Sequence, residues 1–288
     1  MRLKNIPVFF LLILLLSISG CRSIINENYI GKYGLKYELQ ITETPRVNRI
    51  HVLKIDLSRK KTELIPVIPP DPDGEGPAES TLTNPLKLAD KPSVIAFINT
   101  NPWRGLIDIN TGTEDRNWRE GQPVDIIGLA AFDGKIQSKT EENSVAVWID
   151  AKGKVNIGNK PANEFAFEGT AGFTQILKDG VIGTGLDERL APRTSIGLDK
   201  AGKIMWLVVV DGRQAGFSEG VNCTELAKIM RDLGCWNAVN MDGGGSSIMG
   251  LIKDGKLEVV NSPSDRDGGN VRIRPVPIIL TIRGKNKK

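Results

Sequence analysis

The sequence predicts a β-rich α+β fold with mixed sheets, few helices and one βαβ unit near the C-terminus. Short apolar segments separated by Asp-Gly and Lys-Gly turns fill the middle of the chain, which is typical of a β meander. One amphipathic helical segment stands between two apolar runs, Ile204 to Val210 and Trp236 to Met241. A strand–helix–strand unit of this length places its two strands parallel in one sheet. The length of 288 residues allows one large domain or two modest ones.

Charge and histidine content limit the classes of function. The formal net charge is only +4, which argues against a nucleic-acid partner. The chain has one histidine, His51, which we interpret as a surface residue of a strand. This excludes a multi-histidine zinc site and makes a Ser-His-Asp triad improbable. We expect Asp, Glu, Arg, Asn, Ser or Thr to carry the chemistry.

Residues 1–20 have the pattern of an export signal, with a basic start and an apolar core at Val8 to Leu16 that is too short to span a bilayer. The segment Ile18-Ser19-Gly20-Cys21 resembles a bacterial lipobox, in which the cysteine carries lipid after cleavage. We therefore expect Cys21 to anchor an exported protein to a bacterial membrane, on its periplasmic side or at the cell surface. An ordinary cleaved signal peptide is the alternative.

The segment 21–36 is expected to be a tether. Alternating apolar residues then predict two strands, and residues 37–89 are interpreted as an N-terminal β subdomain that either completes the main core or is appended to it. The proline-rich stretch 69–85 predicts a surface loop. A short helix is expected from Leu86 to Asp90, and the main domain covers residues 90–284.

A short buried strand is predicted from Ser93 to Ile98. It leads into Asn99-Thr100-Asn101-Pro102-Trp103, where polar groups at a strand end suit a ligand, although an Asx turn explains them equally well. Trp103 and Trp118 flank a polar loop and could stack on a sugar ring or pack the loop down. Further along, Arg193 precedes two hydroxyl residues at the start of a strand and could bind a carboxylate or phosphate.

The predicted helix begins at Asn222, with Glu225 three residues later as in a capping box, and Gly234 suits the position past its end. Cys223 and Cys235 lie at opposite ends of this helix, roughly 18 Å apart at 1.5 Å per residue. They are therefore expected to be unbonded packing residues.

Asp211 and Asp242 follow the two apolar runs of the βαβ unit. Parallel strands bring both to the same sheet edge, roughly 5 Å apart if the strands are neighbours and about twice that with one strand between them. Such a carboxylate pair suits glycoside hydrolysis or a divalent cation, while the alternative is that an Asp caps its own turn.

Three glycines and two serines follow Asp242. Glycines permit positive φ, so Gly243, Gly244 and Gly245 can aim backbone N–H groups at an anion. A hairpin turn is the alternative. Beyond this motif, a strand is expected from Lys256 to Val260 and an irregular closing strand from Val271 to Ile282, which contains Pro275 and Pro277.

Several motifs resemble the phosphodiester glycosidase family in order and spacing, covering roughly residues 90–282. They are Pro192-Arg193-Thr194-Ser195-Ile196-Gly197, Asp211-Gly212-Arg213, Gly216-Phe217-Ser218-Glu219-Gly220, Glu225-Leu226-Ala227, Leu233-Gly234 and Asp242-Gly243-Gly244-Gly245-Ser246-Ser247. The family includes the catalytic domain of the mannose-6-phosphate uncovering enzyme, an N-acetylglucosamine-1-phosphodiester α-N-acetylglucosaminidase. Where the family usually has Asn-Gly-Gly and an aromatic residue, this chain keeps Asn99 but not the glycines, which bears on the sugar-side pocket.

The resemblance implies hydrolysis of the glycosidic bond of a sugar-1-phosphodiester, with N-acetylglucosamine as one candidate sugar. It implies Asp242 and Asp211 as catalytic carboxylates, which are also the candidate ligands should a divalent cation take part. A non-catalytic lipoprotein that binds phosphorylated or acidic glycans and a metal-dependent phosphodiesterase remain the alternatives. The implied substrate-binding residues are Arg193, Thr194, Arg213, Ser218, Gly243, Gly244, Gly245, Ser246, Ser247, Asn99 and Arg274.

Overall fold

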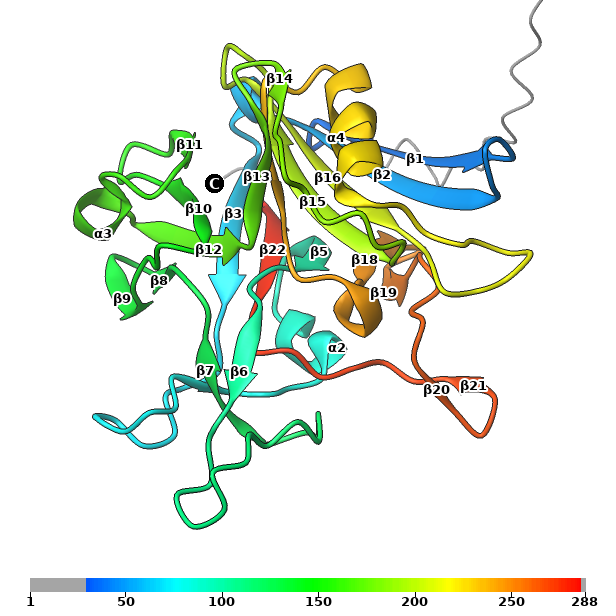
Figure 1. Cartoon of the computed structure of the whole chain (residues 1–288). Coiled ribbons are helices and arrows are strands. Elements are labelled where there is room, and N and C mark those ends of the chain that lie inside the picture. The colour runs from blue at the N-terminus through cyan, green and yellow to red at the C-terminus, as the bar shows by residue number, and fades with distance from the viewer. Residues whose placement is uncertain (1–29, 286–288) are drawn as a thin grey trace, which may run out of the picture.

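A seven-stranded sheet forms the largest layer of the protein (Figure 1). The structure is a computed structural model, and it describes residues 30–285. Every paired strand in this sheet runs antiparallel to its neighbour. In spatial order the strands are β1 (Leu35–Thr42), β2 (Asn48–Asp56), β16 (Ile204–Val210), β15 (Arg193–Leu198), β17 (Asn237–Asn240), β13 (Thr174–Lys178) and β14 (Val181–Ile182).

Further sheets and short helices complete the fold and confirm the predicted β-rich α+β class. One five-stranded sheet has the order β11 (Val155–Ile157), β10 (Val145–Ile149), β12 (Glu168–Gly172), β8 (Ala130–Phe132) and β9 (Lys135–Ser138). The other has the order β19 (Lys256–Val259), β18 (Met249–Lys253), β5 (Val94–Asn99), β22 (Ile279–Gly284) and β3 (Thr62–Val67). Smaller sheets contain β4 (Ser80–Thr81), β7 (Pro123–Ile126) and β6 (Trp103–Gly105), and β20 (Arg266–Asp267) with β21 (Asn270–Val271). The helices are α2 (Pro85–Ala89), α3 (Ala162–Phe165) and α4 (Cys223–Asp232), with 3-10 turns η1 (Leu57–Arg59) and η2 (Gly244–Ser246).

The two faces of the seven-stranded sheet bury different clusters. Leu207 and Val209 of β16 pack in the main core, together with Ile98 of β5 and Leu280 of β22. Val208 and Val210 point to the other face, where they pack in the cluster that α4 covers. This split follows from the two-residue alternation of side chains along a strand. The same alternation determines which side chains can reach the cavities described in the next section.

The predicted βαβ unit is present. β15 pairs antiparallel with both β16 and β17, so β16 and β17 run parallel with one strand between them. Helix α4 connects them and begins with the predicted capping box: the Glu225 N–H donates to Asn222 Oδ1 at 2.8 Å, and the Asn222 N–H donates to Glu225 Oε2 at 3.1 Å. Cys223 and Cys235 are both buried and unbonded, as expected.

The N-terminal strands belong to the same sheets as the rest of the chain. β2 pairs with β16 and β3 pairs with β22, so the segment 37–89 shares the main core. Ile30 is only 1% exposed and β1 begins at Leu35, which corrects the tether expected to reach residue 36. The predicted signal segment 1–20 and Cys21 lie outside the described residues.

The closing strand is shorter than the sequence predicted. β22 begins at Ile279, after Pro275 and Pro277, and lies centrally between β5 and β3. Because proline has no N–H to donate, a strand paired on both sides can begin only beyond these two residues. The expected strand from Val271 to Ile282 is therefore wrong for residues 272–278.

Candidate active site

Asp242 follows β17 on a backbone that is held from several sides. Its N–H donates to the carbonyl of Thr100 at 2.8 Å, and its carbonyl accepts from Asn99 Nδ2 at 2.7 Å. Asn99 Oδ1 accepts from the Thr194 hydroxyl at 2.8 Å and from the Ile248 N–H at 3.1 Å. Asn99 and Thr194, predicted to bind substrate, are buried beneath the Asp242 loop and hold it in place.

The glycines after Asp242 allow two guanidinium groups to approach the backbone closely. Gly244 has φ +62°, and a Cβ there would lie 3.1 Å from two nitrogens of Arg213. A Cβ at Gly245 would lie 2.2 Å from both Arg274 Nη2 and Asp265 Oδ1. A side chain at Gly245 would displace Arg274 and Asp265, and at Gly244 the positive φ itself favours glycine.

The predicted anion nest is not formed, because this loop satisfies its own N–H groups. The turn is tight, and most of its backbone N–H groups donate hydrogen bonds to oxygen atoms of the protein. The bonded donors are the N–H groups of Gly243 to Asp242 Oδ1 (2.9 Å), Gly244 to the Pro192 carbonyl (2.9 Å), Ser246 to the Gly243 carbonyl (3.3 Å) and Ser247 to the Gly244 carbonyl (3.2 Å).

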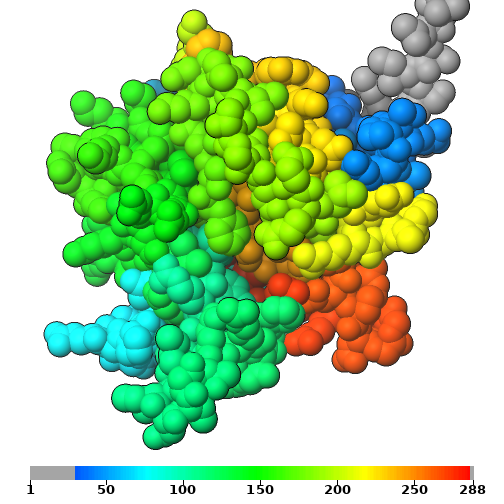
Figure 2. All heavy atoms as spheres, viewed as in Figure 1, coloured from blue at the N-terminus to red at the C-terminus, as the bar shows by residue number. Residues whose placement is uncertain are grey.

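Asp242 lines two neighbouring cavities that have several wall residues in common. On the face shown in Figure 2, orange and red atoms of the C-terminal part of the chain lie recessed between green and yellow segments. The larger cavity is about 570 Å³ and the smaller about 260 Å³. The lining residues common to both are Trp118, Phe173, Asp242 and Arg274.

The two cavities differ in chemistry. The larger is also lined by Arg189, Arg193 and Arg213 and suits an anion. The smaller contains Trp103 and Ser246, with Trp118 and Phe173 beside them, and suits the apolar face of a sugar ring. The structure therefore brings together Asp242, the predicted arginines and one of the predicted serines.

The arginines are not equally available to a ligand. Arg193 is 7% exposed, with Nε bonded to the Val221 carbonyl at 3.2 Å and Nη2 to the Arg189 carbonyl at 2.6 Å and Asp187 at 3.1 Å. Within residues 30–285, the exposed guanidinium of Arg213 makes no hydrogen bond or ion pair. Arg213 is thus the cation most open to a bound anion.

Arg274 is fixed by its neighbours on two sides. Its Nε and Nη2 donate to the two carboxylate oxygens of Asp265 at 2.8 and 2.9 Å. The guanidinium carbon lies 4.0 Å from the centre of the Trp118 ring, a distance at which the cation is attracted to the aromatic face. Asp265 thereby offsets much of this charge and orients Arg274 beside Asp242.

Burial raises the pKa of Asp242 to about 6. The Ser246 hydroxyl, the Arg274 charge and the Gly243 N–H act in the opposite direction and favour the carboxylate, but desolvation is the largest effect. The side chain is deep in the protein yet partly open to the cavities. A carboxylate with a pKa near neutrality suits a general base or a nucleophile.

This pKa predicts a pH dependence of activity. If ionised Asp242 performs the chemistry, kcat/KM should fall about tenfold per pH unit below a midpoint near pH 6, because protonation removes the reactive form. A pH–rate profile at subsaturating substrate measures this midpoint. A profile that is flat between pH 4.5 and 7.5 would contradict the assignment.

Asp211 is not part of this cavity wall, which corrects the expected catalytic pair. It is 1% exposed and lines neither cavity. Since Val210 faces the α4 side, the next side chain points to the opposite face, away from Arg193 and Asn240. Asp211 and Asp242 share a sheet edge, but the structure does not bring their carboxylates into one cleft. Among residues 30–285, no group of three or more His, Cys, Asp and Glu side chains is placed to hold a metal ion.

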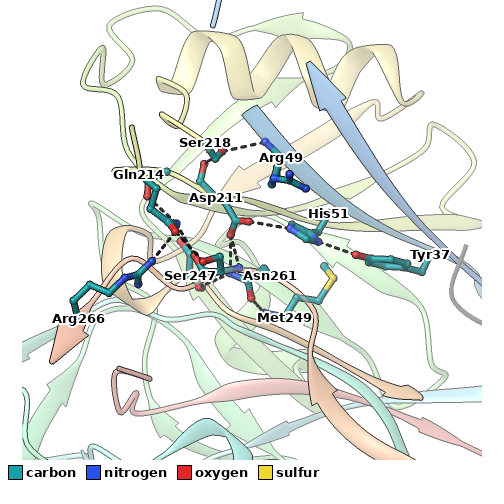
Figure 3. Close-up of polar contacts among 12 residues, drawn as sticks. Tyr37, Arg49, His51, Asp211, Gln214, Ser218, Ser247, Met249, Asn261 and Arg266 are labelled. Atoms are coloured by element: carbon teal, nitrogen blue, oxygen red, sulfur yellow. Dashed lines mark hydrogen bonds and ion pairs between the residues drawn. The ribbon is translucent and has the colours of Figure 1, made fainter. Parts of the chain in front are cut away.

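His51 lies behind Asp211 and is buried at 3% exposure, so its interpretation as a surface residue is wrong. Its Nε2 lies 3.1 Å from Asp211 Oδ2 and its Nδ1 lies 2.8 Å from the Tyr37 hydroxyl (Figure 3). Ser218, predicted to bind substrate, donates to the Asp211 carbonyl at 2.7 Å and accepts from the Arg49 N–H at 3.0 Å. It is a structural residue of the turn, and neither it nor Ser247 lines the two cavities.

Sequence reasoning missed several residues of the site, Arg189 in the wall of the larger cavity among them. Phe173 is 40% exposed and lines both cavities, and Asp265 orients Arg274. Asn240 lines the larger cavity, and its buried Oδ1 has no hydrogen-bond partner among the described residues. Only Asn240 had a local signal, as an amide at the end of an apolar strand.

The β-rich α+β fold thus carries a partly desolvated carboxylate among guanidinium groups and aromatic rings, at the junction of two cavities. The family model for phosphodiester glycosidases matches residues 104–283, and the chain belongs to this family. A comparison with curated proteins finds no match. Within residues 30–285, no helix has the length and apolar character needed to cross a membrane.

Solved structures share the fold at low sequence identity. The catalytic domain of zebrafish N-acetylglucosamine-1-phosphodiester alpha-N-acetylglucosaminidase, auto-inhibited by its pro-peptide, is 20% identical with a TM-score of 0.60, covering 87% of this chain and 82% of its own. A hypothetical protein from Synechocystis is 14% identical with a TM-score of 0.53, covering 88% of this chain and 62% of its own. A putative exported protein from Burkholderia pseudomallei K96243 is 15% identical with a TM-score of 0.53, covering 84% and 75%.

Proposed function

We propose that the protein hydrolyses the glycosidic bond of an α-linked sugar-1-phosphodiester. The observation that carries the proposal is the position of Asp242, whose pKa is raised to about 6, between an arginine-lined and a tryptophan-lined cavity. The anomeric carbon would lie beside Asp242, which acts as general base toward water or as nucleophile. The C–O bond breaks, the phosphate leaves with its oxygen, and water supplies the new hydroxyl of the sugar. A phosphate leaving group needs little protonation, so a second carboxylate is not required.

The two cavities divide the substrate. The sugar occupies the smaller cavity, where Trp103 and Trp118 offer ring faces. The phosphate occupies the larger one, where Arg213 supplies a guanidinium that has no side-chain partner in the described part of the chain, and Arg193 supplies a buried positive charge. N-acetylglucosamine is the first sugar to test, because the zebrafish structure with the same fold is named for it.

The test is incubation with an α-N-acetylglucosamine-1-phosphodiester in ¹⁸O-labelled water, with free sugar and phosphate analysed by mass spectrometry. Label in the sugar supports C–O cleavage. Label in the phosphate, together with loss of activity in chelator, would indicate the metal-dependent phosphodiesterase instead. Binding without any product from a panel of sugar-1-phosphodiesters would favour the non-catalytic glycan-binding alternative.

We further propose export and attachment to a bacterial membrane through a lipid on Cys21. The support is the short apolar signal segment ending in Ile18-Ser19-Gly20-Cys21, and one structural relative is named as a putative exported protein. Cys21→Ala should abolish incorporation of a labelled fatty acid and move the protein from the membrane to the soluble fraction. Unchanged membrane attachment in this variant would contradict the anchor.

A further inference from the structure

Asp211 is the centre of a buried hydrogen-bond network that joins three distant segments (Figure 3). Its Oδ1 accepts from Asn261 Nδ2 at 3.1 Å and from the Ser262 N–H at 2.8 Å, and its Oδ2 faces His51 Nε2 at 3.1 Å. The residue is 1% exposed. A carboxylate that is this buried and has partners from three residues is a structural junction and is closed to a substrate.

Behind Asp211 the network continues through His51 to Tyr37. A carboxylate only accepts, so His51 Nε2 donates to Asp211, and His51 Nδ1 lies at hydrogen-bond distance, 2.8 Å, from the Tyr37 hydroxyl. Burial raises the pKa of Tyr37, and the nearby Asp211 charge raises it further. Contacts at both ring nitrogens hold His51 in its rotamer beneath the end of the sheet.

On the Oδ1 side of Asp211, the network extends through Asn261 to the segment that begins with Asp242. Asn261 Nδ2 also donates to the Ser247 carbonyl at 3.1 Å, and Asn261 Oδ1 accepts from the Met249 N–H at 2.8 Å (Figure 3). Asn261 therefore fastens the far end of the glycine loop.

The second branch reaches the segment that carries Arg213. The Ser262 hydroxyl donates to Gln214 Oε1 at 2.8 Å, and Gln214 Nε2 donates to the Ser262 carbonyl at 2.9 Å. Arg213 lies between Asp211 and Gln214 with φ 58°, a strained conformation that must be held by its surroundings.

We infer that Asp211, held by His51 and Tyr37, is a positioning residue that fixes Arg213 relative to the Asp242 loop. Its two branches fasten the two segments that contribute Arg213 and the Asp242 loop to the larger cavity, although Asp211 itself does not line it. The activity readout of this inference rests on the proposed function, but the network itself does not.

The test compares His51→Leu with the conservative His51→Gln, because a glutamine amide can still donate to Asp211. His51→Leu should lower kcat/KM about 100-fold, as small misplacements of reacting groups do, and His51→Gln should recover part of the loss. The pH midpoint near 6 should stay unchanged in both, because Asp242 remains. Ser138→Ala, which removes the buried hydroxyl contacts of Ser138 in β9 with the Ile126 carbonyl and Glu79, is the control for loss of a buried polar group.

Hydrogen–deuterium exchange gives a readout that needs no substrate. His51→Leu should speed exchange in peptides covering 212–218 and 243–262 and leave those of β10 and β12 unchanged. If His51→Leu does not fold, Tyr37→Phe, which removes a single hydroxyl, should show the same pattern more weakly. Normal kcat/KM and normal exchange in a folded His51→Leu would overturn the inference, as would a shifted pH midpoint. If exchange is altered as expected but the wild-type protein cleaves no sugar phosphodiester, the positioning role of the network is supported and only the proposed function is rejected.

Discussion

Replacing Asp242 by asparagine is expected to lower kcat about 10³-fold and to leave the protein folded. Among the described residues, Asp242 is the carboxylate shared by both cavities, and asparagine keeps its shape but can neither accept a proton nor attack carbon. Initial rates at saturating sugar-1-phosphodiester measure the loss.

The stability of this variant provides an internal check. Folding raises the pKa of Asp242 from 3.8 to about 6, so the unfolded chain ionises first as pH rises. Whatever stability the protonated group contributes is complete below about pH 4 and is lost as pH rises through 6. Asp242→Asn should therefore melt at or above the wild-type temperature at pH 8.

The matched control for this variant is Asp199→Asn. Asp199 lies in the turn between β15 and β16, at the end of the sheet away from Asp242, where its side chain accepts from the N–H groups of Lys203 and Ile204. The control should retain full activity. Wild-type turnover by Asp242→Asn would rule out a catalytic role for this carboxylate.

Replacing Arg213 by alanine is expected to lower kcat/KM by about 10- to 100-fold. Its guanidinium lines the larger cavity without a partner among the described residues, and a charge-assisted hydrogen bond contributes about 1.5–3 kcal/mol. Arg213→Lys should recover part of the loss, since it keeps the charge but not the two parallel donors. Steady-state kinetics, together with the inhibition constant of inorganic phosphate, measure both effects.

The matched control is Arg231→Ala, on the exposed side of α4 and paired with Asp232. It removes one positive charge from the same protein and should not change kcat/KM or phosphate inhibition. Equal losses in Arg213→Ala and Arg231→Ala would mean that net charge, and not contact with the phosphate, causes the effect.

Local patterns were sufficient for much of the fold. The capping box consists of Asn222 and Glu225, only three positions apart, so both the existence of helix α4 and its first residue could be predicted locally. The apolar runs that became β16 and β17 also needed no distant information. The order of the remaining strands, including β15 between β16 and β17 and β2 beside β16, was not specified by local sequence.

Long-range packing decided the features that were missed. His51 became a buried residue because β2 pairs with β16 and places it opposite Val209. Asp265 and Phe173 joined the site because loops from different sheets meet there, and nothing in their own neighbourhoods indicated it.

The sequence by itself determined the β-rich class and the parallel placement of β16 and β17, and it made Asp242 and Arg213 candidate site residues. Only the tertiary structure decided that Asp211 turns away from Asp242 and that the glycines make room for two arginines. The physical reason is that chain order fixes which sheet edge a residue reaches. The pleat and the neighbouring strands then fix which face its side chain occupies.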